Sequence, residues 1–166
     1  MLDCETPLGK KYIEEQYKTQ AILEARGYTV INTPSKDHNS DIMLAKEIDG
    51  KLTLFGVAEI KSRRMAGDKV IDREYVKRNG YLVTYDKIKY GAQISSFYKV
   101  PFFLIVNLLL DNRILVWQLT HANGEKTIEY KLADTETQRT CNGGSIVRRN
   151  AYLPFDTEFL TEIEIK

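Results

Sequence analysis

Cysteine is scarce in this sequence: Cys4 and Cys141 are lone thiols far apart, and neither belongs to a CxxC motif or a Cys/His cluster. Their isolation argues against a zinc site and favours a reducing, cytoplasmic setting. The N-terminus lacks a basic segment followed by an apolar one, so we expect no secretory signal. The longest apolar stretch, residues 100–110, is interrupted by Pro101 and is shorter than the roughly 20 residues of a membrane helix. We interpret it as a buried strand and expect no membrane partner.

A large excess of one charge is also missing, since the formal net charge is +1. Overall charge therefore does not indicate a nucleic-acid binder, and only local charge can do so. No linker rich in glycine, serine or proline divides the 166 residues, which suffice for one domain with a core. A content of 43% hydrophobic and 28% charged residues argues against disorder. We expect a single domain over residues 1–166.

The first half of the chain predicts a helix and three strands. Good helix formers over residues 9–26 precede Gly27, a typical helix stop. A short β-branched strand over residues 28–33 follows. Strands over residues 42–45 and 52–60 flank an Asp-Gly turn, which predicts a hairpin.

The second half begins with a basic segment, residues 61–78, that we expect to form a loop or a short helical lid. A helix is predicted from about Asp86, with Tyr85-Asp86 as its cap, to Tyr98 before a proline. Two further strands, joined by a turn, and less regular C-terminal elements complete the prediction; they cover residues 102–110, 113–119, 127–132 and 159–165.

The ends of the predicted hairpin carry the most informative residues. Asp41 and Glu59 lie at the end away from the turn, so the pairing brings them together. Glu59 and Lys61 are two apart and share one face of their strand, while Ala58 and Ile60 point the opposite way into a core. Carboxylate ligands without histidine or cysteine favour Mg²⁺ or Mn²⁺, which stabilise charge in phosphodiester hydrolysis.

A plainer interpretation exists for each of these groups. In that interpretation, Asp41 is only the loop residue before a strand, and Glu59 and Lys61 form a salt bridge on a solvated face. Trp117 and the tyrosines, which stack on bases in some proteins, are then core or edge residues.

The order helix, strand, Asp41 strand, Glu59-Ile60-Lys61 strand, helix, strand resembles the PD-(D/E)XK phosphodiesterase superfamily. The resemblance covers residues 9–119 and leaves residues 120–166 as peripheral elements. It implies an α/β fold in which a mixed central β-sheet is flanked by helices, with a restriction-endonuclease-like core. The proline that often precedes the aspartate in this superfamily is replaced by Ser40.

The resemblance also implies roles for individual residues. Lys61 would orient or deprotonate the attacking water, and a glutamate on the first helix would complete the site, Glu15 in our choice and Glu14 as the alternative. The metal ligands so implied for Mg²⁺, with Mn²⁺ as a substitute, are Asp41, Glu59, the Ile60 carbonyl and Glu15.

DNA contacts are expected from the basic segment and from the helix after it. Beside a metal site, such a segment suits phosphate contacts, although most such runs are solvated loops. Gln93 resembles the glutamine of the RecB-like exonuclease branch, but Phe97 stands where that branch has tyrosine; an ordinary exposed helix residue is the alternative. The basic candidates are Arg63, Arg64, Lys69, Arg73, Lys77 and Arg78.

Together these features predict a Mg²⁺-dependent nuclease, and the resemblance implies that its substrate is DNA and that it leaves 5′-phosphates. The small size fits a phage or mobile-element enzyme, which would act in the cytoplasm, that of the host if it is phage-encoded. Endonuclease and exonuclease activity both stay open. One alternative is a structure-selective Holliday-junction resolvase, which requires a homodimer. Another is a catalytically silent DNA-binding or interaction module on the same fold, and a partner that delivers the substrate is a further hypothesis.

Overall fold

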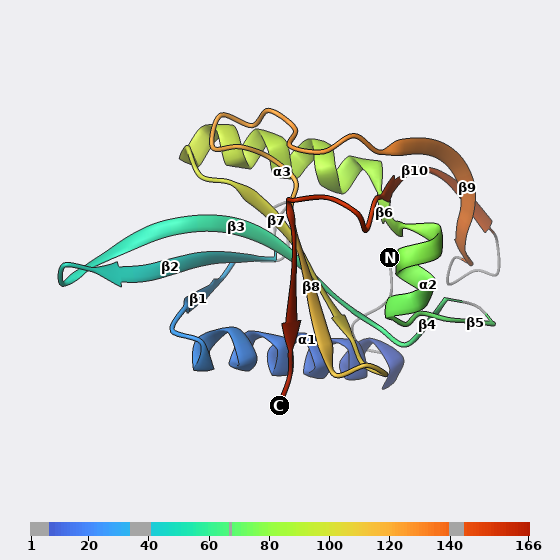
Figure 1. Ribbon diagram of the computed structural model, residues 1–166, viewed down its shortest axis with the longest axis horizontal. Coiled ribbons are helices and arrows are strands. Elements are labelled where there is room, and N and C mark those ends of the chain that lie inside the picture. Colours follow the sequence, from blue (N-terminus) through green and yellow to red (C-terminus); the bar gives the residue numbers. More distant parts are fainter. Residues whose placement is uncertain (1–6, 34–40, 67, 140–144) are drawn as a thin grey trace.

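The computed structural model describes residues 7–33, 41–66, 68–139 and 145–166, which leaves Cys4, Ser40 and Cys141 outside the described residues (Figure 1). Along the chain the elements are α1 (Pro7–Ala25), β1 (Thr29–Asn32), β2 (Ile42–Ile48), β3 (Lys51–Arg63), β4 (Met65–Ala66), β5 (Lys69–Val70), α2 (Arg73–Asn79), β6 (Tyr81–Thr84), α3 (Tyr85–Tyr98), β7 (Phe102–Leu108), β8 (Arg113–Gln118), β9 (Lys131–Arg139), β10 (Ser145–Leu153) and β11 (Leu160–Glu164).

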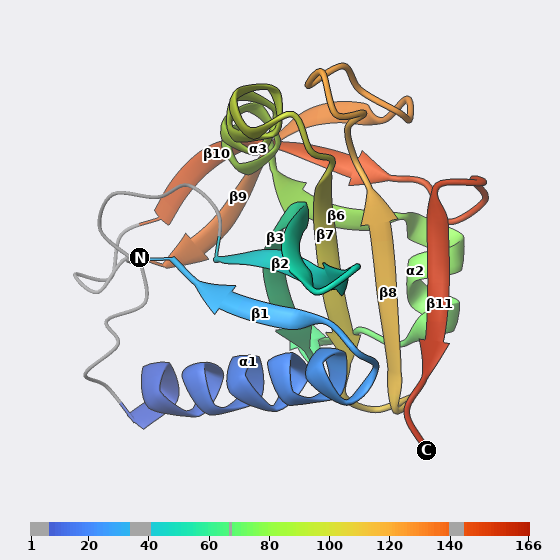
Figure 2. The same ribbon diagram turned by 90° about the vertical axis from the view of Figure 1, so that its left-hand side faces the viewer.

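A six-stranded mixed sheet forms the centre of the protein, in the order β1-β2-β3-β7-β8-β11. Strands β3 and β7 are parallel, and the other neighbours are antiparallel. A parallel pair needs a crossover, which β4, β5, α2, β6 and α3 provide here. Helix α1 lies on one face of the sheet and α3 on the other (Figure 2). The predicted α/β architecture, a mixed central sheet flanked by helices, is confirmed.

Two smaller sheets accompany the central one. Strands β6, β10 and β9 form an antiparallel three-stranded sheet, and β4 and β5 form a short ribbon. The last strand, β11, pairs with β8 at the edge of the central sheet. The C-terminal part of the chain thus completes both larger sheets.

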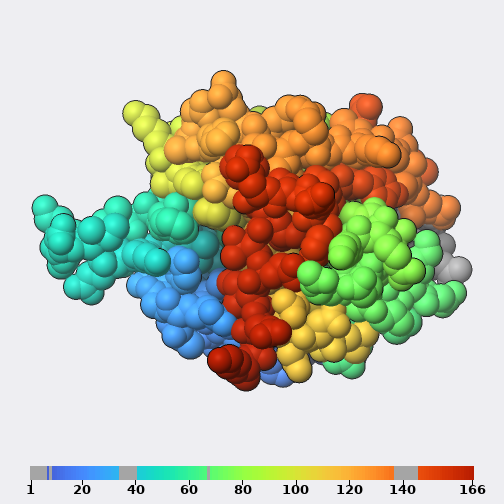
Figure 3. Space-filling model, in the orientation of Figure 1, coloured from blue at the N-terminus to red at the C-terminus, as the bar shows by residue number. Residues whose placement is uncertain are grey.

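Both predicted hairpins are present. Asp49 and Gly50, with φ of 50° and 73°, form the turn between β2 and β3, as two-residue hairpin turns require. Asn112, with φ of 47°, lies in the turn between β7 and β8. The β2–β3 hairpin projects from the body of the molecule (Figure 3).

A β-bulge in this hairpin sets which side chains of β3 face α3. The register of β2 against β3 shifts between Leu44 and Ala45, so Phe55 has no residue opposite it. An extra residue reverses the alternation of a strand. Leu54 and Val57 therefore pack against the same cluster although they are three positions apart.

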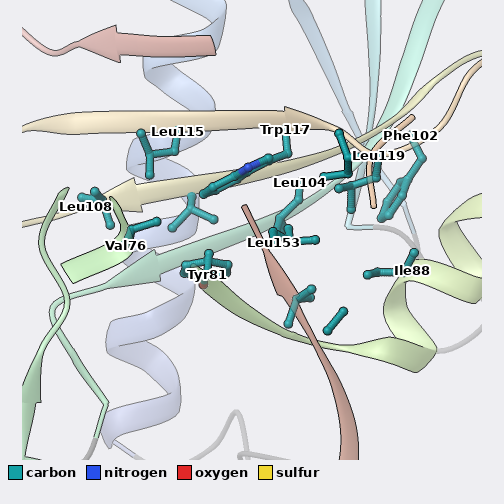
Figure 4. Packing of buried hydrophobic residues seen from close by; sticks show 14 of the residues in the cluster. Val76, Tyr81, Ile88, Phe102, Leu104, Leu108, Leu115, Trp117, Leu119 and Leu153 are labelled. Atoms are coloured by element: carbon teal, nitrogen blue, oxygen red, sulfur yellow. The ribbon is translucent and has the colours of Figure 1, made fainter. Parts of the chain in front are cut away.

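The buried side chains form one cluster on each face of the sheet. The larger cluster joins the sheet to α2, α3 and the three-stranded sheet, and Tyr81 stacks on Trp117 in it, with ring centroids 5.5 Å apart (Figure 4). Trp117 is fully buried, so its interpretation as a core residue is confirmed. The smaller cluster lies against α1 and contains Leu23, Ile42, Leu44, Ala58, Ile60, Ile105 and Ile114.

The structure corrects the description of residues 61–78 as a loop or lid. Strand β3 continues to Arg63, the β4–β5 ribbon follows, and Asp72 caps α2 by accepting a 2.7 Å hydrogen bond from the Tyr75 N–H. The predicted cap of α3 is also wrong. The N-cap is Thr84, and its side chain makes no capping hydrogen bond.

Strands β6 and β10 were not predicted, and of residues 127–132 only the last two belong to a strand. Among the described residues, no helix is long and apolar enough to cross a membrane.

Candidate functional site

Asp41 lies directly before β2, where the backbone is held from both sides. Its N–H donates a 3.0 Å hydrogen bond to the Ala58 carbonyl of β3. Its own carbonyl accepts hydrogen bonds from the Thr33 N–H at 3.3 Å and the Thr33 hydroxyl at 3.1 Å. The predicted position of Asp41 beside residues 58–60 of β3 is therefore confirmed, although β3 does not end there but continues to Arg63.

The carboxylate of Asp41 turns toward the edge of β3. Its Oδ2 accepts a 2.8 Å hydrogen bond from the Ile60 N–H, at a point beyond the last pair of β2 and β3, Ile42 with Ala58. The N–H and C=O of one strand residue point to the same edge. The Ile60 carbonyl thus faces the same edge as the Asp41 carboxylate, which a shared ligand set requires.

Glu59 is the most deeply placed charge of the site, since its side chain is 0% exposed. The Lys61 Nζ lies 2.5 Å from its Oε1, and the Lys87 Nζ lies 3.2 Å from each of its two oxygens. Both ammonium groups reach water, with 29% and 42% of the side chains exposed. The result is a buried anion covered on its solvent side by two cations.

The predicted salt bridge between Glu59 and Lys61 is present, but the burial of Glu59 contradicts its placement on a solvated face. Glu59 and Lys61 project from the side of β3 that carries Val57, toward α3. Ala58 and Ile60 pack on the opposite side against the α1 cluster, as predicted. Burying the Glu59 carboxylate costs free energy of desolvation. A salt bridge on the surface of a strand would avoid that cost.

Sequence reasoning missed Lys87. It lies in the first turn of α3, which crosses β3 so that its amine reaches Glu59. Within the sequence it is one of several lysines near a predicted helix start, and no spacing rule connects it to a strand 28 positions earlier. Only the crossover that returns the chain over the sheet brings the two together.

The two carboxylates interact electrostatically. Burial raises the pKa of Asp41 above its ordinary value of 3.8, and the negative charge of Glu59 raises it further. Lys61, the Ile60 N–H and Lys87 act in the opposite direction. A cation at this edge would relieve both causes of the raised pKa.

Tyr81 lies beneath the site in the main core. Burial raises the pKa of its phenol, the positive charge of Arg63 opposes the shift, and the negative charge of Glu59 adds to it. A tyrosine with a raised pKa stays neutral over the physiological range. We therefore assign Tyr81 a packing role against Trp117.

The two helix glutamates differ in exposure. Glu15 is half-buried and Glu14 is exposed. The Glu15 carbonyl accepts a 3.0 Å hydrogen bond from the Thr19 hydroxyl, which in turn accepts a 3.0 Å bond from the Asn107 amide on β7. This face of α1 is tied to the sheet, which favours Glu15 over Glu14 as a site residue.

A metal ion at this site would need several oxygen donors close together. The described ranges contain no group of three or more His, Cys, Asp and Glu side chains arranged to hold a metal, so Glu15 does not form one with Asp41 and Glu59. Mg²⁺ needs only one or two carboxylates, because waters and substrate phosphates complete its shell. Asp41, Glu59 and the Ile60 carbonyl offer oxygen donors of this kind, although both oxygens of Glu59 also contact lysines. Their role as metal ligands, like that of Glu15, remains a prediction.

The basic residues of the 61–78 segment are dispersed. Arg63 is half-buried at the end of β3 and donates a hydrogen bond to the Ser62 carbonyl. Arg73 is committed to an ion pair, since its Nε and Nη2 bind both oxygens of Glu162 on β11 at 2.7 and 2.9 Å. The remaining candidates are exposed on the β3–β4 connection, β5 and α2; they are Arg64, Lys69, Lys77 and Arg78.

Gln93 is exposed on α3, together with its neighbours Phe97 and Tyr98. The two rings pack edge to face with centroids 5.0 Å apart, and 79% of Phe97 is exposed. Gln93 thus lies on the outer surface of the helix, where both a contact to a ligand and an ordinary surface role are open to it.

Comparison with protein-family models, curated proteins and solved structures finds no match for this chain. The interpretation of the site consequently depends on its own geometry and on the order of its motifs.

Proposed function

We propose that this chain is a Mg²⁺-dependent nuclease that hydrolyses DNA phosphodiester bonds and leaves 5′-phosphates, on a restriction-endonuclease-like core of the PD-(D/E)XK type. One observation carries the proposal. The Asp41 carboxylate accepts a 2.8 Å hydrogen bond from the Ile60 N–H, and it thus lies beside the part of β3 in which the buried Glu59 carboxylate contacts the Lys61 amine at 2.5 Å. Positioned acids and an amine are the groups that phosphodiester hydrolysis requires.

Asp41, Glu59 and the Ile60 carbonyl would hold the metal. When bound, Mg²⁺ supplies stabilisation of the charge on the phosphoryl oxygens and a lower pKa of a coordinated water. Mn²⁺ has the same preference for oxygen ligands and would substitute for it.

The chain itself supplies the remaining groups. Glu59 holds Lys61 and Lys87 at the rim of the site, where both are partly exposed to water. An ammonium group between an anchoring carboxylate and the solvent can donate hydrogen bonds to phosphate oxygens as negative charge develops on them. Lys61 and Lys87 therefore share the positioning of the phosphate and its stabilisation during attack.

The test is cleavage of supercoiled circular DNA and of end-labelled linear DNA in Mg²⁺ and in EDTA. Wild type is compared with Lys61→Ala, and Lys126→Ala is the matched control because Lys126 is an exposed lysine paired with Glu129. We expect metal-dependent cleavage in wild type and Lys126→Ala, and loss in Lys61→Ala. Cleavage of circles indicates an endonuclease, and cleavage from ends alone indicates an exonuclease.

Other outcomes separate the rival functions. Cleavage confined to four-way junctions, by a protein that sediments as a dimer, would assign the resolvase function instead. DNA binding without cleavage of any substrate in Mg²⁺ or Mn²⁺ would assign the silent binding module. Cleavage that survives Lys61→Ala unchanged would remove the site from the reaction.

A further inference from the structure

The surface contains a hollow of about 440 Å³ between the first turns of α3 and strand β10. Figure 2 shows these two elements next to each other at the upper end of the molecule. The hollow adjoins the candidate site, because Lys87 lines it and also contacts Glu59 at 3.2 Å. Its lining residues are Thr84, Asp86, Lys87, Tyr90, Val147, Arg148 and Arg149.

The charges around the hollow are mainly positive. Asp86 is the acid among the lining residues, and its carboxylate lies 2.7 Å from the Lys89 ammonium. Arg149 stands opposite Asp134 in the β9–β10 pair, yet neither Arg148 nor Arg149 forms an ion pair with a described residue. The Lys87 ammonium is already held by Glu59, whereas the two arginines have no such partner within the described ranges. Because Arg148 and Arg149 are adjacent in β10, their side chains project from opposite faces of the strand and can approach an anionic ligand at its edge from two sides.

The backbone at the hollow is also open on one side. Strand β10 pairs with β9 over residues 145–152, but with β6 only over residues 150–153. The edge of residues 147–149 toward the start of α3 therefore carries no strand among the described residues. The Arg148 carbonyl accepts a 3.1 Å hydrogen bond from the Asn150 side-chain amide, and a ligand could lie along this edge without displacing a strand.

An aromatic ring completes the lining. Tyr90 is 41% exposed and lines the hollow from α3, while the two arginines line it from β10. A flat aromatic surface combined with guanidinium groups is the combination with which proteins stack a base and hold the adjoining phosphates. A volume of about 440 Å³ falls in the range of pockets for one small ligand, which is the scale of a nucleotide of a single strand.

We propose that the hollow between α3 and β10 binds a single-stranded segment of nucleic acid next to the bond that is cut, with Arg148 and Arg149 on phosphates and Tyr90 stacked on a base. This inference rests on the proposed function in one respect, the path of the bound nucleic acid. From the hollow, the nucleic-acid strand would lead past Lys87 to the carboxylates of the candidate site. The site then prefers frayed ends, flaps or single strands over continuous duplex.

Binding is tested by fluorescence anisotropy with a labelled 20-nucleotide single strand and the matched duplex, in EDTA so that no cleavage occurs. Arg148→Ala with Arg149→Ala is compared with Lys10→Ala with Lys11→Ala, which removes the same charge from exposed positions of α1. We expect the arginine pair to lower single-strand affinity about ten-fold. The slope of log affinity against log salt becomes shallower by about 1.4, or about 0.7 for each phosphate that the protein no longer neutralises.

Tyr90 is tested with two variants. Tyr90→Ala removes the ring, and we expect single-strand affinity to fall about five-fold or more, while Tyr90→Phe keeps the stacking surface and binds like wild type. Circular dichroism of each variant verifies the fold before binding is compared.

Failure of this inference is distinguishable from failure of the proposed function. Unchanged affinity and salt slope in the arginine pair, or an equal loss in the Lys10/Lys11 control, would overturn the binding site even in an active nuclease. Absent binding of single strands by wild type would overturn it as well. Binding that depends on Arg148 and Arg149, in a protein that cleaves nothing, would support the hollow and reject the nuclease.

Discussion

The backbone N–H of Ile60 donates a 2.8 Å hydrogen bond to the Asp41 carboxylate, and this bond joins the first residue before β2 to the strand that carries Glu59. Asp41 is thereby held close to a second, fully buried carboxylate. Burial and the Glu59 charge raise the pKa of Asp41, so ionisation of this acid is less favourable in the folded protein than in the unfolded chain.

The variant Asp41→Asn separates the hydrogen bond of Asp41 from its negative charge. The amide oxygen can still accept the bond from Ile60, but the charge is gone, so we expect Mg²⁺-dependent cleavage to fall about 100-fold or more without loss of fold. Because the folded protein binds the Asp41 proton more tightly than the unfolded chain does, the contribution of this group to stability is lost as pH rises above about 3.8.

The measurement is thermal unfolding of wild type and Asp41→Asn between pH 3 and 8. Without metal, we expect the variant to gain in stability relative to wild type as pH rises through the raised pKa. Mg²⁺ should stabilise wild type more than the variant at neutral pH, because the ion needs the carboxylate. A difference in melting temperature that is independent of both pH and Mg²⁺ would contradict the coupling.

Lys61 and Lys87 make a matched pair because each contacts the same carboxylate. Each single change to alanine leaves Glu59 one ammonium partner, so both variants should fold. We expect Lys61→Ala to abolish cleavage, and Lys87→Ala to raise KM more than it lowers kcat, since Lys87 also lines the hollow beside α3.

The double change Lys61→Ala with Lys87→Ala leaves a fully buried carboxylate without a cation. We expect it to destabilise the protein by about 3 kcal/mol, and Glu59→Gln in the same background should restore much of that loss. Urea unfolding of wild type, both single variants, the double variant and its Glu59→Gln derivative measures the coupling. Additive single effects, with no rescue by Glu59→Gln, would show that the two lysines do not compensate Glu59.

The choice between the two helix glutamates is open to a direct test. Glu15→Gln should lower the cleavage rate, because Glu15 is half-buried on the face of α1 tied to the sheet, while exposed Glu14→Gln should not. Both substitutions keep shape and helix propensity, so stability should change by less than about 0.5 kcal/mol. Equal rates for both variants and wild type would remove the helix from the site.

The parts of this fold that the sequence predicts are those determined by neighbours in the chain. Asp49-Gly50 defines a turn locally, and the turn places Asp41 beside Glu59 by simple pairing. The burial of Glu59 and the arrival of Lys87 depend instead on α3 crossing β3. No periodicity within either segment encodes that approach.

Strand β10 is another element that depends on contacts between distant parts of the chain and that the sequence pattern did not predict. Its residues pair with β6, more than 60 positions earlier, and their sequence of arginines and an asparagine lacks the alternation of a half-buried strand. The pairing becomes visible only when Ala151 and Leu153 join the main core. A strand whose apolar half lies at one end is easily missed by pattern alone.

Arg73 was predicted to contact DNA, and its observed partners indicate a different role. Its guanidinium binds Glu162 through two hydrogen bonds of 2.7 and 2.9 Å and lies 4.9 Å from the Phe155 ring, so it ties α2 to β11 and the C-terminal segment. A bidentate guanidinium pair is specific to arginine. We therefore expect Arg73→Lys to lower the melting temperature and leave affinity for DNA unchanged.

The pH dependence of the melting temperature distinguishes a structural role of Arg73 from a role in DNA binding. The hydrogen bond from Arg73 lowers the pKa of Glu162 below its ordinary value of 4.5, so the stabilisation is present above that value and is lost as pH falls through the lowered pKa. The melting temperatures of wild type and Arg73→Lys should converge in acid, while those of Lys77→Ala and wild type stay parallel. A loss of DNA affinity in Arg73→Lys at constant melting temperature would restore Arg73 to the DNA-binding surface and leave Glu162 without a structural role.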